Sequence, residues 1–326
     1  MGLRRMSLPD EQRERLLEKL SREVRGPLQT ALNDKDVIEI VCNADGHVWR
    51  LSRASGWEEV DHISSAKADS ILSTVAALTD NIINSSNPQI QCVFPLDGSR
   101  LQGLSPPAVS APIFDIRKHS AHIYSIDEYV KDKIITQPQA NIIREAVTTR
   151  KNILISGGTC SGKTTLAKTI IDLARMLGNP GERYVIIEDT KELHCNAKNV
   201  VHIHAYSRDM LSRFTQAAMR LRPDRVIIGE VRGREAYDLM YLLNSGHPGS
   251  FTTIHANNAR LALHKFLMLA RESGEDVHPN RIAECFDIVI SIRRTEHGLR
   301  VDEVTEVIGY DRSDFIVKPL NKGDVP

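Results

Sequence analysis

A glycine-rich segment near the middle of the chain has the residue types and spacing that hold the phosphates of a nucleotide. It runs Gly157-Gly158-Thr159-Cys160-Ser161-Gly162-Lys163-Thr164 and matches the pattern G-x-x-x-x-G-K-[ST]. In such a loop, backbone N–H groups at a helix N-terminus point at phosphate oxygens, and the helix dipole adds positive potential. We therefore expect this loop and the following Thr165 to bind ATP. Lys163 would reach the β- and γ-phosphates, and the Thr164 hydroxyl would ligate Mg²⁺.

The flanking residues favour this interpretation over a glycine-rich turn that only starts a helix. An apolar strand candidate, 153–155, precedes the loop, and a helical pattern with Leu166 and Ile170 follows it. Cys160 stands where such loops often have glycine, which accepts a positive φ. In that conformation a cysteine costs on the order of 1 kcal/mol, and a helix N-terminus favours its thiolate. We expect a loop that binds nucleotide more weakly and is sensitive to oxidation; a harmless substitution is the alternative.

Hydrolysis also needs a carboxylate that orders Mg²⁺ and polarises the attacking water. Two apolar strand candidates lead into acids, with Glu188 at the end of 184–188 and Glu230 directly after 226–229. Because the carboxyl ends of neighbouring parallel strands meet at the ligand crevice, both acids could face the phosphates. We predict that Glu230 activates water and that Glu188 supports Mg²⁺, directly or through water. A single acid at such a position could instead be a solvated loop residue or a helix cap.

The first part of the chain predicts a small α+β domain over residues 1–117. Segments 9–25 and 66–83 have helical patterns, and a hairpin signal, Asn43-Ala44-Asp45-Gly46, separates two short apolar runs. Further strands are expected over 90–117. The polar segment 118–136, which is mixed in sign and has no strong period, is interpreted as a linker.

Residues 137–326 predict an α/β domain, because short apolar strands alternate with helices and this order implies a largely parallel sheet covered on both faces. A helix over 138–149 opens the domain. The strand candidates are 152–156, 184–188, 226–229, 251–254 and 288–292, and the helices between them are 164–177, 209–221, 234–244, 259–272 and 279–285.

Composition weighs against several other classes of protein. Lys+Arg and Asp+Glu both number 42 in 326 residues, and this zero net charge weighs against a protein that coats nucleic acid. The five cysteines form no C-x-x-C pair, which disfavours a disulfide framework or a zinc site and fits a reducing cytoplasm. The sequence has no signal peptide and no apolar run long enough to span a membrane, so we expect a cytoplasmic protein.

Four blocks of the sequence together resemble the type II/type IV secretion traffic ATPases. They are the phosphate loop, 187–193 (similar to that family's Asp box), 222–233 (its Walker B block) and 246–257 (its His box). Their order and spacing also match, and 43–46 and 94–101 resemble the family's N-terminal domain, so the resemblance covers essentially the whole chain. Within the family the sequence most resembles conjugal transfer ATPases of the TrbB type. Cys160 is the clearest departure from the family pattern.

The resemblance implies a RecA-like phosphate-loop domain behind the smaller α+β domain, and a homo-oligomer that is a hexameric ring. It implies that His255 senses the γ-phosphate, although a strand-end histidine can also be satisfied by backbone. It further implies that Arg100 and Arg117 stabilise the charge on that phosphate from a neighbouring subunit, although lone arginines are usually surface residues. Arg220, Arg222 and Arg232 are further candidates for the subunit interface.

The predicted function is therefore an ATP-hydrolysing motor of a type IV secretion or conjugation system that drives DNA or protein transfer, or pilus assembly. The expected partners are the inner-membrane components and the coupling protein of that system. Peripheral association with the cytoplasmic face of the inner membrane is compatible with the family, and direct nucleic-acid binding is not expected. Two alternatives remain: a DNA translocase or helicase, which would need a basic channel, and a nucleotide-binding scaffold ring with little turnover, which only Cys160 favours.

Overall fold

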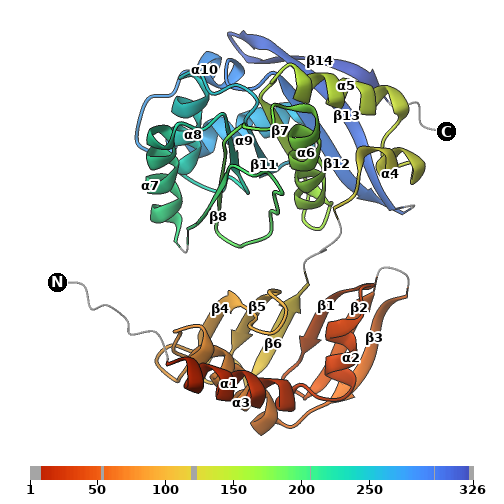
Figure 1. Cartoon of the computed structure of the whole chain (residues 1–326), viewed down its shortest axis with the longest axis vertical. Helices are drawn as coiled ribbons and strands as arrows, with labels where there is room; N and C mark the ends of the chain where they lie inside the picture. Colours follow the sequence, from red (N-terminus) through yellow and green to blue (C-terminus); the bar gives the residue numbers. More distant parts are fainter. Residues whose placement is uncertain (1–8, 53–54, 119–122, 206, 297, 323–326) are drawn as a thin grey trace. The chain divides into compact units, whose positions relative to one another are not determined.

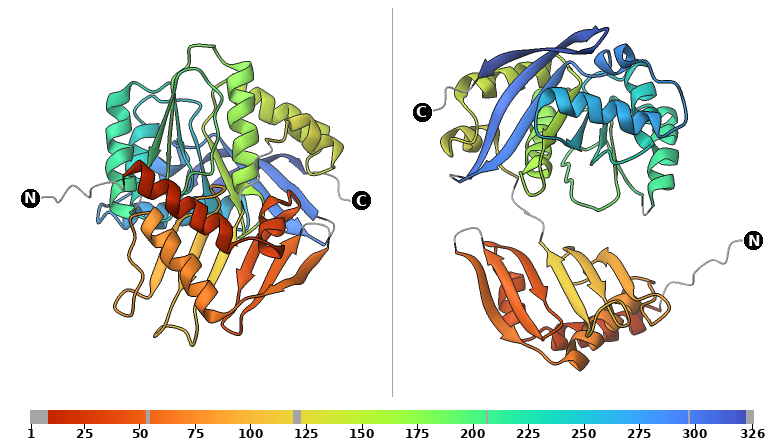
Figure 2. Two further views of the ribbon diagram at one scale, coloured as in Figure 1. Left: turned by 60° about the horizontal axis from the view of Figure 1, so that its bottom comes forward. Right: turned by 180° about the vertical axis from the view of Figure 1, so that it is seen from behind.

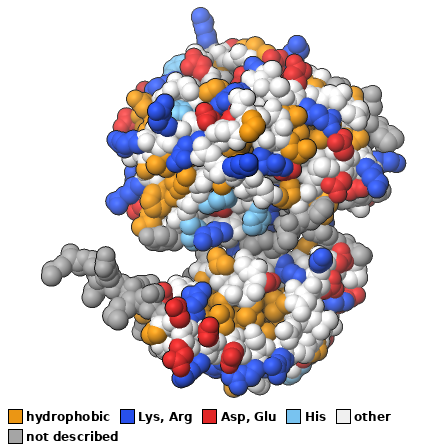
Figure 3. Space-filling model, in the orientation of Figure 1, with side chains coloured by type: hydrophobic (Ala, Val, Ile, Leu, Met, Phe, Trp, Pro, Cys, Tyr) orange, Lys and Arg blue, Asp and Glu red, His pale blue; other side chains and the backbone are white. Residues whose placement is uncertain are grey.

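The computed structural model describes residues 9–52, 55–118, 123–205, 207–296 and 298–322 of the chain. The chain divides into two compact units, Met1–Ala121 and His122–Pro326, each with its own sheet (Figure 1). No helix of the described residues is long and apolar enough to cross a membrane. On the face of the second unit seen in Figure 3, basic and acidic side chains are interspersed, as the balanced composition leads one to expect.

The first unit is a six-stranded antiparallel sheet in the order β3-β2-β1-β6-β5-β4, with α1 and α3 on one face (Figure 2). Alternate strand residues such as Ile40 and Leu101 are buried against Leu72 of α3. A Cβ at Gly103 would lie 2.4 Å from Leu72 Cδ2, so the helix rests directly on β5. The elements are α1 Asp10–Glu23, α2 Pro27–Asn33, β1 Val37–Cys42, β2 His47–Ser52, β3 Gly56–His62, α3 Ser65–Leu78, β4 Gln89–Val93, β5 Arg100–Leu104 and β6 Ile113–Arg117.

The expected linker over 118–136 differs from the structure, because part of it is a helix of the second unit. Helix α4, Ile126–Lys131, begins at a capping box in which Ser125 and Glu128 satisfy each other's backbone N–H groups. Ile126 and Tyr129, three residues apart, are buried in the core of the second unit. Six residues are too few to show a helical period, and most residues of the segment are polar, so the helix could not be predicted from the sequence.

The second unit is built on an eight-stranded sheet in the order β14-β13-β12-β7-β11-β10-β8-β9. The six strands from β12 to β9 are parallel, which confirms the predicted α/β architecture. One face of the sheet packs on α4, α5 and α6 and the other on α7, α8, α9 and α10. The elements are α5 Gln137–Thr148, β7 Ile153–Gly157, α6 Lys163–Leu177, β8 Tyr184–Glu188, β9 Val200–His204, α7 Arg208–Ala218, β10 Arg225–Ile228, α8 Glu235–Leu243, β11 Phe251–His255, α9 Ala259–Arg271, α10 Pro279–Ala283, β12 Ile288–Thr295, β13 Gly298–Asp311 and β14 Asp314–Lys322.

The antiparallel strands β13 and β14 at one edge were not predicted, and neither was β9 as a strand of the parallel sheet. The hairpin extends the sheet beyond β12, so that β13 lies two positions and β14 three positions from the phosphate-loop strand β7. Its sequence mixes charged and apolar residues without the continuous apolar run of the central strands.

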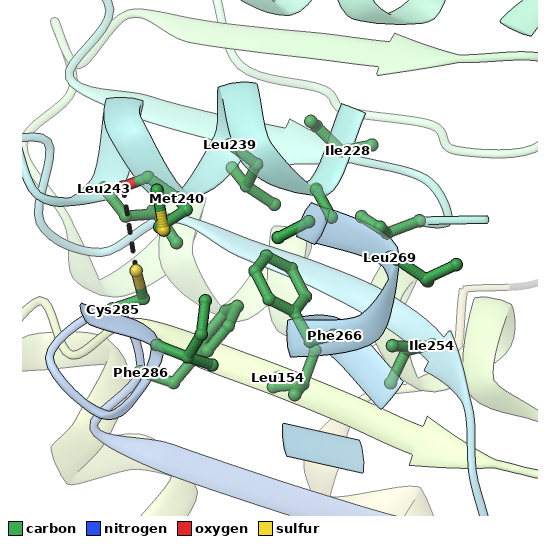
Figure 4. Close-up of a cluster of buried hydrophobic side chains, with 14 of the residues drawn as sticks. Leu154, Ile228, Leu239, Met240, Leu243, Ile254, Phe266, Leu269, Cys285 and Phe286 are labelled. Atoms are coloured by element: carbon green, nitrogen blue, oxygen red, sulfur yellow. Dashed lines mark hydrogen bonds between the residues drawn. The ribbon is translucent and has the colours of Figure 1, made fainter. Parts of the chain in front are cut away.

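The parallel strands rest on an apolar core between the sheet and helices α8 and α9. Figure 4 shows Leu154, Ile228 and Ile254 from the sheet meeting Leu239 of α8 and Phe266 of α9. The strand residues are fully buried, and such dense packing allows little displacement of the strand ends. The residues that follow the strands are therefore held at fixed positions at the carboxyl-terminal ends of the strands.

Candidate active site

The glycine-rich segment joins β7 to α6, which confirms the predicted strand–loop–helix arrangement. Gly162, directly before the helix, has φ 86°, a left-handed conformation that glycine adopts without strain. A Cβ at Gly157 would lie 2.3 Å from the Ile292 carbonyl oxygen and 2.4 Å from Ser161 Oγ. The loop thus folds back tightly on β12, and only glycine fits at its first position.

Lys163 is held inside this loop. Its ammonium donates to the carbonyl oxygens of Gly157 at 2.9 Å and Gly158 at 2.6 Å, and the side chain is buried. The Ser161 hydroxyl is also buried and, among the described residues, has no hydrogen-bond partner. A buried cation and an unpaired hydroxyl at the N-terminus of a helix fit an incoming phosphate, which would accept from both.

Glu230 lies just beyond β10 and faces Arg232 and His255. Arg232 Nη2 donates to its Oε2 at 2.7 Å, and His255 Nε2 approaches its Oε1 within 2.9 Å. Burial alone would raise the pKa of Glu230, but the Arg232 hydrogen bond and the charges of Arg232, His255 and Lys163 outweigh it and leave that pKa lowered. Glu230 is therefore an ionised carboxylate at neutral pH.

His255 connects Glu230 to Lys163. It ends β11, where its register partner on β7 is Gly157. Lys163 Nζ lies 3.2 Å from His255 Nδ1, and because an ammonium can only donate, Nδ1 accepts. The ring proton then sits on Nε2, facing Glu230. Burial lowers the pKa of His255, with Glu230 opposing and Lys163 assisting, so the imidazole is neutral at pH 7.

Glu188 holds the loop that follows β8. It is only 4% exposed, and its Oε2 accepts from the backbone N–H groups of Glu192 and Leu193, both at 2.9 Å. Burial raises the pKa of Glu188 to about 7, and the two N–H groups only partly offset this effect. The predicted role in supporting Mg²⁺ did not include this anchoring of the loop.

Sequence comparison places these residues in a known family. The chain matches the family described as "Type II/IV secretion system protein" over residues 107–299. It is 39% identical over 301 residues to the conjugal transfer protein TrbB of Rhizobium radiobacter, across 92% of this chain and 93% of that protein. The chain belongs to the type II/IV secretion system protein family.

The chain is also similar to VirB11, a type IV secretion system protein of Bartonella quintana. The two are 30% identical over 328 residues, which cover 85% of this chain and 90% of VirB11. Among solved structures, the Legionella pneumophila ATPase DotB superposes with a TM-score of 0.60 at 16% identity, covering 96% of this chain and 84% of DotB. That likeness concerns the fold. With the phosphate loop in place, this family member is an ATPase, as predicted.

In this family member, Arg232 joins two of the motif blocks. Besides Glu230, it contacts Asp189 of the Asp box through Nη1. The sequence offered Arg232 only as a candidate for a subunit interface. The structure pairs it with two acids of its own chain, and the spacing Glu230-Val231-Arg232 after a buried strand was the available signal for this pairing.

The oxygen ligands of the site fit Mg²⁺. Thr164 is the second residue of α6 and is half-buried, and Glu188 is the last residue of β8. The described part of the chain holds no group of three or more His, Cys, Asp or Glu side chains that could hold a metal ion by itself. Mg²⁺ usually takes one or two protein oxygen ligands, with waters and substrate phosphates, so the Thr164 hydroxyl and the Glu188 carboxylate are of the right chemical kind for it.

Cys160 has φ 55°, so the expected left-handed conformation at this position is confirmed. The residue is exposed, and its carbonyl oxygen accepts from Arg294 Nε at 3.4 Å. Arg294 lies on β12 and is an exposed cation beside the loop. It was not predicted, because 134 residues separate it from Cys160 and only the sheet order brings the two together.

Arg100 and Arg117 belong to the first unit. They are direct partners on the neighbouring strands β5 and β6, so both side chains emerge on the same face of that sheet. Arg117 is exposed and Arg100 is half-buried. Their predicted action on a nucleotide remains a proposal.

Proposed function

We propose that this chain is the ATP-hydrolysing motor of a type IV secretion or conjugation system and works as a hexameric ring. The observation that carries the proposal is the contact of one neutral histidine with both Lys163 and Glu230. This contact joins the residue that would bind the γ-phosphate to the residue that would activate water. The names of the relatives, a conjugal transfer protein and a type IV secretion protein, support the cellular role.

The chemistry follows from the charges of the site. Residues 157–165 would hold the phosphates of ATP, and Lys163 would turn from its loop carbonyls to the β- and γ-phosphate oxygens. The ionised Glu230 would accept a proton from water as the water oxygen attacks the γ-phosphorus. The bond from that phosphorus to the bridging oxygen then breaks, which releases ADP and phosphate. Bound Mg²⁺, held by Thr164 and supported by Glu188, supplies positive charge that offsets the phosphate oxygens.

In this proposal, His255 would sense the γ-phosphate. Its Nδ1 accepts from Lys163, so movement of Lys163 onto a phosphate would free that nitrogen and change the partners of the imidazole. Arg100 and Arg117 would act on the same phosphate from a neighbouring subunit. In the proposed ring, closure on ATP and opening after hydrolysis would drive DNA or protein transfer, or pilus assembly.

The proposed partners are the inner-membrane components and the coupling protein of the system, with the ring at the cytoplasmic face of that membrane. Balanced charge supports protein partners over direct nucleic-acid binding, since a translocase channel needs a basic lining.

The test is Mg²⁺-dependent ATP hydrolysis by the purified chain beside Lys163→Ala and Glu230→Gln, with mass measured by light scattering. We expect turnover by a six-subunit particle, loss of nucleotide binding in Lys163→Ala, and binding without turnover in Glu230→Gln. Nucleotide binding without turnover in the unmodified chain would refute the motor and favour the scaffold ring. A stable monomer in the presence of ATP would refute the ring.

A further inference from the structure

A row of polar side chains crosses the second sheet directly behind the phosphate loop. Ser156 of β7, Ser291 of β12 and Glu303 of β13 are register partners on three adjacent strands. Ser156 Oγ lies 2.8 Å from Ser291 Oγ, and Ser291 Oγ lies 3.1 Å from Glu303 Oε1. The row continues into α9, because the backbone N–H of Ala259 donates to the same Glu303 oxygen at 2.8 Å.

The direction of these hydrogen bonds is fixed by their acceptor. A carboxylate oxygen has no proton to give, so the Ser291 hydroxyl donates to Glu303. Ser291 has then used its proton, so Ser156 must donate to Ser291. Glu303 Oε1 therefore accepts the last hydrogen bond from the strands, donated by Ser291, and also the one from the helix, donated by Ala259.

The row lies among apolar neighbours. Ser156 is fully buried and Ser291 is nearly so, and the apolar residues Leu154, Val289 and Ile254, which share their face of the sheet, are fully buried. Burying hydroxyls in such a sheet is unfavourable unless each one is satisfied. Apolar residues would hold the strands together as well, so stability alone does not account for a polar row at this level of the sheet.

Both ends of the row adjoin the candidate active site. Ser156 directly precedes Gly157 of the phosphate loop. Ala259 is the first residue of α9, and only three residues separate it from His255. Glu303 therefore ties the segment that follows His255 to the strand that carries the loop, and its charge is also favourable at the N-terminus of α9.

We propose that Glu303 is a positioning residue for hydrolysis, which sets His255 against Lys163 and Glu230 through the row Ser156–Ser291–Glu303–Ala259. The inference rests on the proposed role of His255. Because Glu303 contacts neither the phosphate loop residues nor Glu230 in any described hydrogen bond, its loss should leave nucleotide binding intact and impair turnover.

The variants are Glu303→Ala, Glu303→Gln and Ser291→Ala, with Glu306→Ala on the same strand as matched control. We expect Glu303→Ala to lower kcat about tenfold with nucleotide Kd changed less than about twofold, since a small misplacement of a catalytic group has effects of this size. Glu303→Gln should retain most of kcat, because its amide oxygen can still accept both bonds. Ser291→Ala should add little in the Glu303→Ala background, because both changes break one row.

Amide hydrogen exchange over 256–262 gives a readout that does not need hydrolysis. Glu303→Ala should raise exchange there, most at Ala259, while Glu306→Ala leaves it unchanged. Unchanged exchange in Glu303→Ala would overturn the proposal whether or not the chain hydrolyses ATP. Equal losses in kcat and nucleotide affinity, or a lowered unfolding midpoint with normal kcat, would also overturn it. Absence of turnover in the unmodified chain would instead count against the motor, with the exchange result still deciding the role of Glu303.

Discussion

A buried ion pair at the amino-terminal ends of the parallel strands in the second unit gives the sharpest stability prediction. Arg225, at the start of β10, is 2% exposed, and its Nε donates to Glu182 Oε2 at 2.8 Å. Its other nitrogens donate to the carbonyl oxygens of Gly249 and Val147. Arg150 donates to the second Glu182 oxygen at 2.8 Å. The group joins the ends of four elements, so we predict that Arg225→Met strongly destabilises the second unit.

The magnitude follows from burial. Removing one member of a buried pair costs about 3–5 kcal/mol, and because Glu182 keeps its ion pair with Arg150, we expect a cost near the lower limit, about 3 kcal/mol. For a unit of about 200 residues, each kcal/mol lowers the midpoint of thermal unfolding by roughly 2–4 °C, so we expect a fall of about 10 °C. The control is Lys151→Met in the same unit. Its ion pair with Asp287 is 47% and 38% exposed, and such pairs contribute about 0.2–1 kcal/mol.

The two tryptophans make the assay selective, because Trp49 and Trp57 both lie in the first unit. Tryptophan fluorescence therefore follows that unit, whereas far-ultraviolet circular dichroism follows both. We expect Arg225→Met to lower the circular-dichroism midpoint and to leave the fluorescence midpoint in place. The double variant with Glu182→Met should recover part of the loss. A shift no larger than that of Lys151→Met would refute the reasoning.

Three further predictions concern the site. Because burial raises the pKa of Glu188 from its ordinary 4.5 to about 7, ionising it opposes folding; the free energy of unfolding should fall by about 3 kcal/mol as pH rises through that interval, and urea titrations of Glu188→Gln should lack this fall. Cys160→Gly should relieve strain on the order of 1 kcal/mol, bind nucleotide more tightly and resist peroxide; equal affinity, with both proteins indifferent to peroxide, would contradict this. Arg232→Met should raise the pKa of Glu230, so the acid limb of the kcat–pH profile should move to higher pH; an unmoved limb would show that another group titrates there.

Much of the second unit could be predicted because its signals are local. Each central strand is a short apolar run, and each helix has its own apolar period, so alternation alone indicated a parallel sheet. Helix α4 and the hairpin β13–β14 were not predicted, for two different reasons. The helix is too short to show a period, and the hairpin strands carry charges such as Glu303 and Glu306 among their apolar residues.

The residues of the candidate site likewise divide into those that could be predicted from the sequence and those that only the structure reveals. Glu230 follows a strand and Lys163 starts a helix, and the general rule that strand ends converge was enough to predict that both face the phosphates. The role of His255 came instead from the resemblance to the family. Arg294 could not be found this way, because its place beside Cys160 depends on which strand borders β7. The anchoring role of Glu188 depends on the path of a loop, which has no period to read.

The block 246–257, which resembles a single family motif, serves two physical purposes at its two ends. Gly249, before β11, has φ 79°, and a Cβ there would lie 2.5 Å from Arg225 Nη1. Because glycine has no Cβ, it leaves the space that the buried guanidinium occupies. His255, at the other end of the same strand, contacts Lys163 and Glu230. Gly249→Ala should therefore reduce stability with little effect on kcat of the folded protein, whereas His255→Asn should do the reverse. The five residues of β11 thus separate the amino-terminal ends of the strands, where Arg225 stabilises the fold, from the carboxyl-terminal ends, where we place the chemistry.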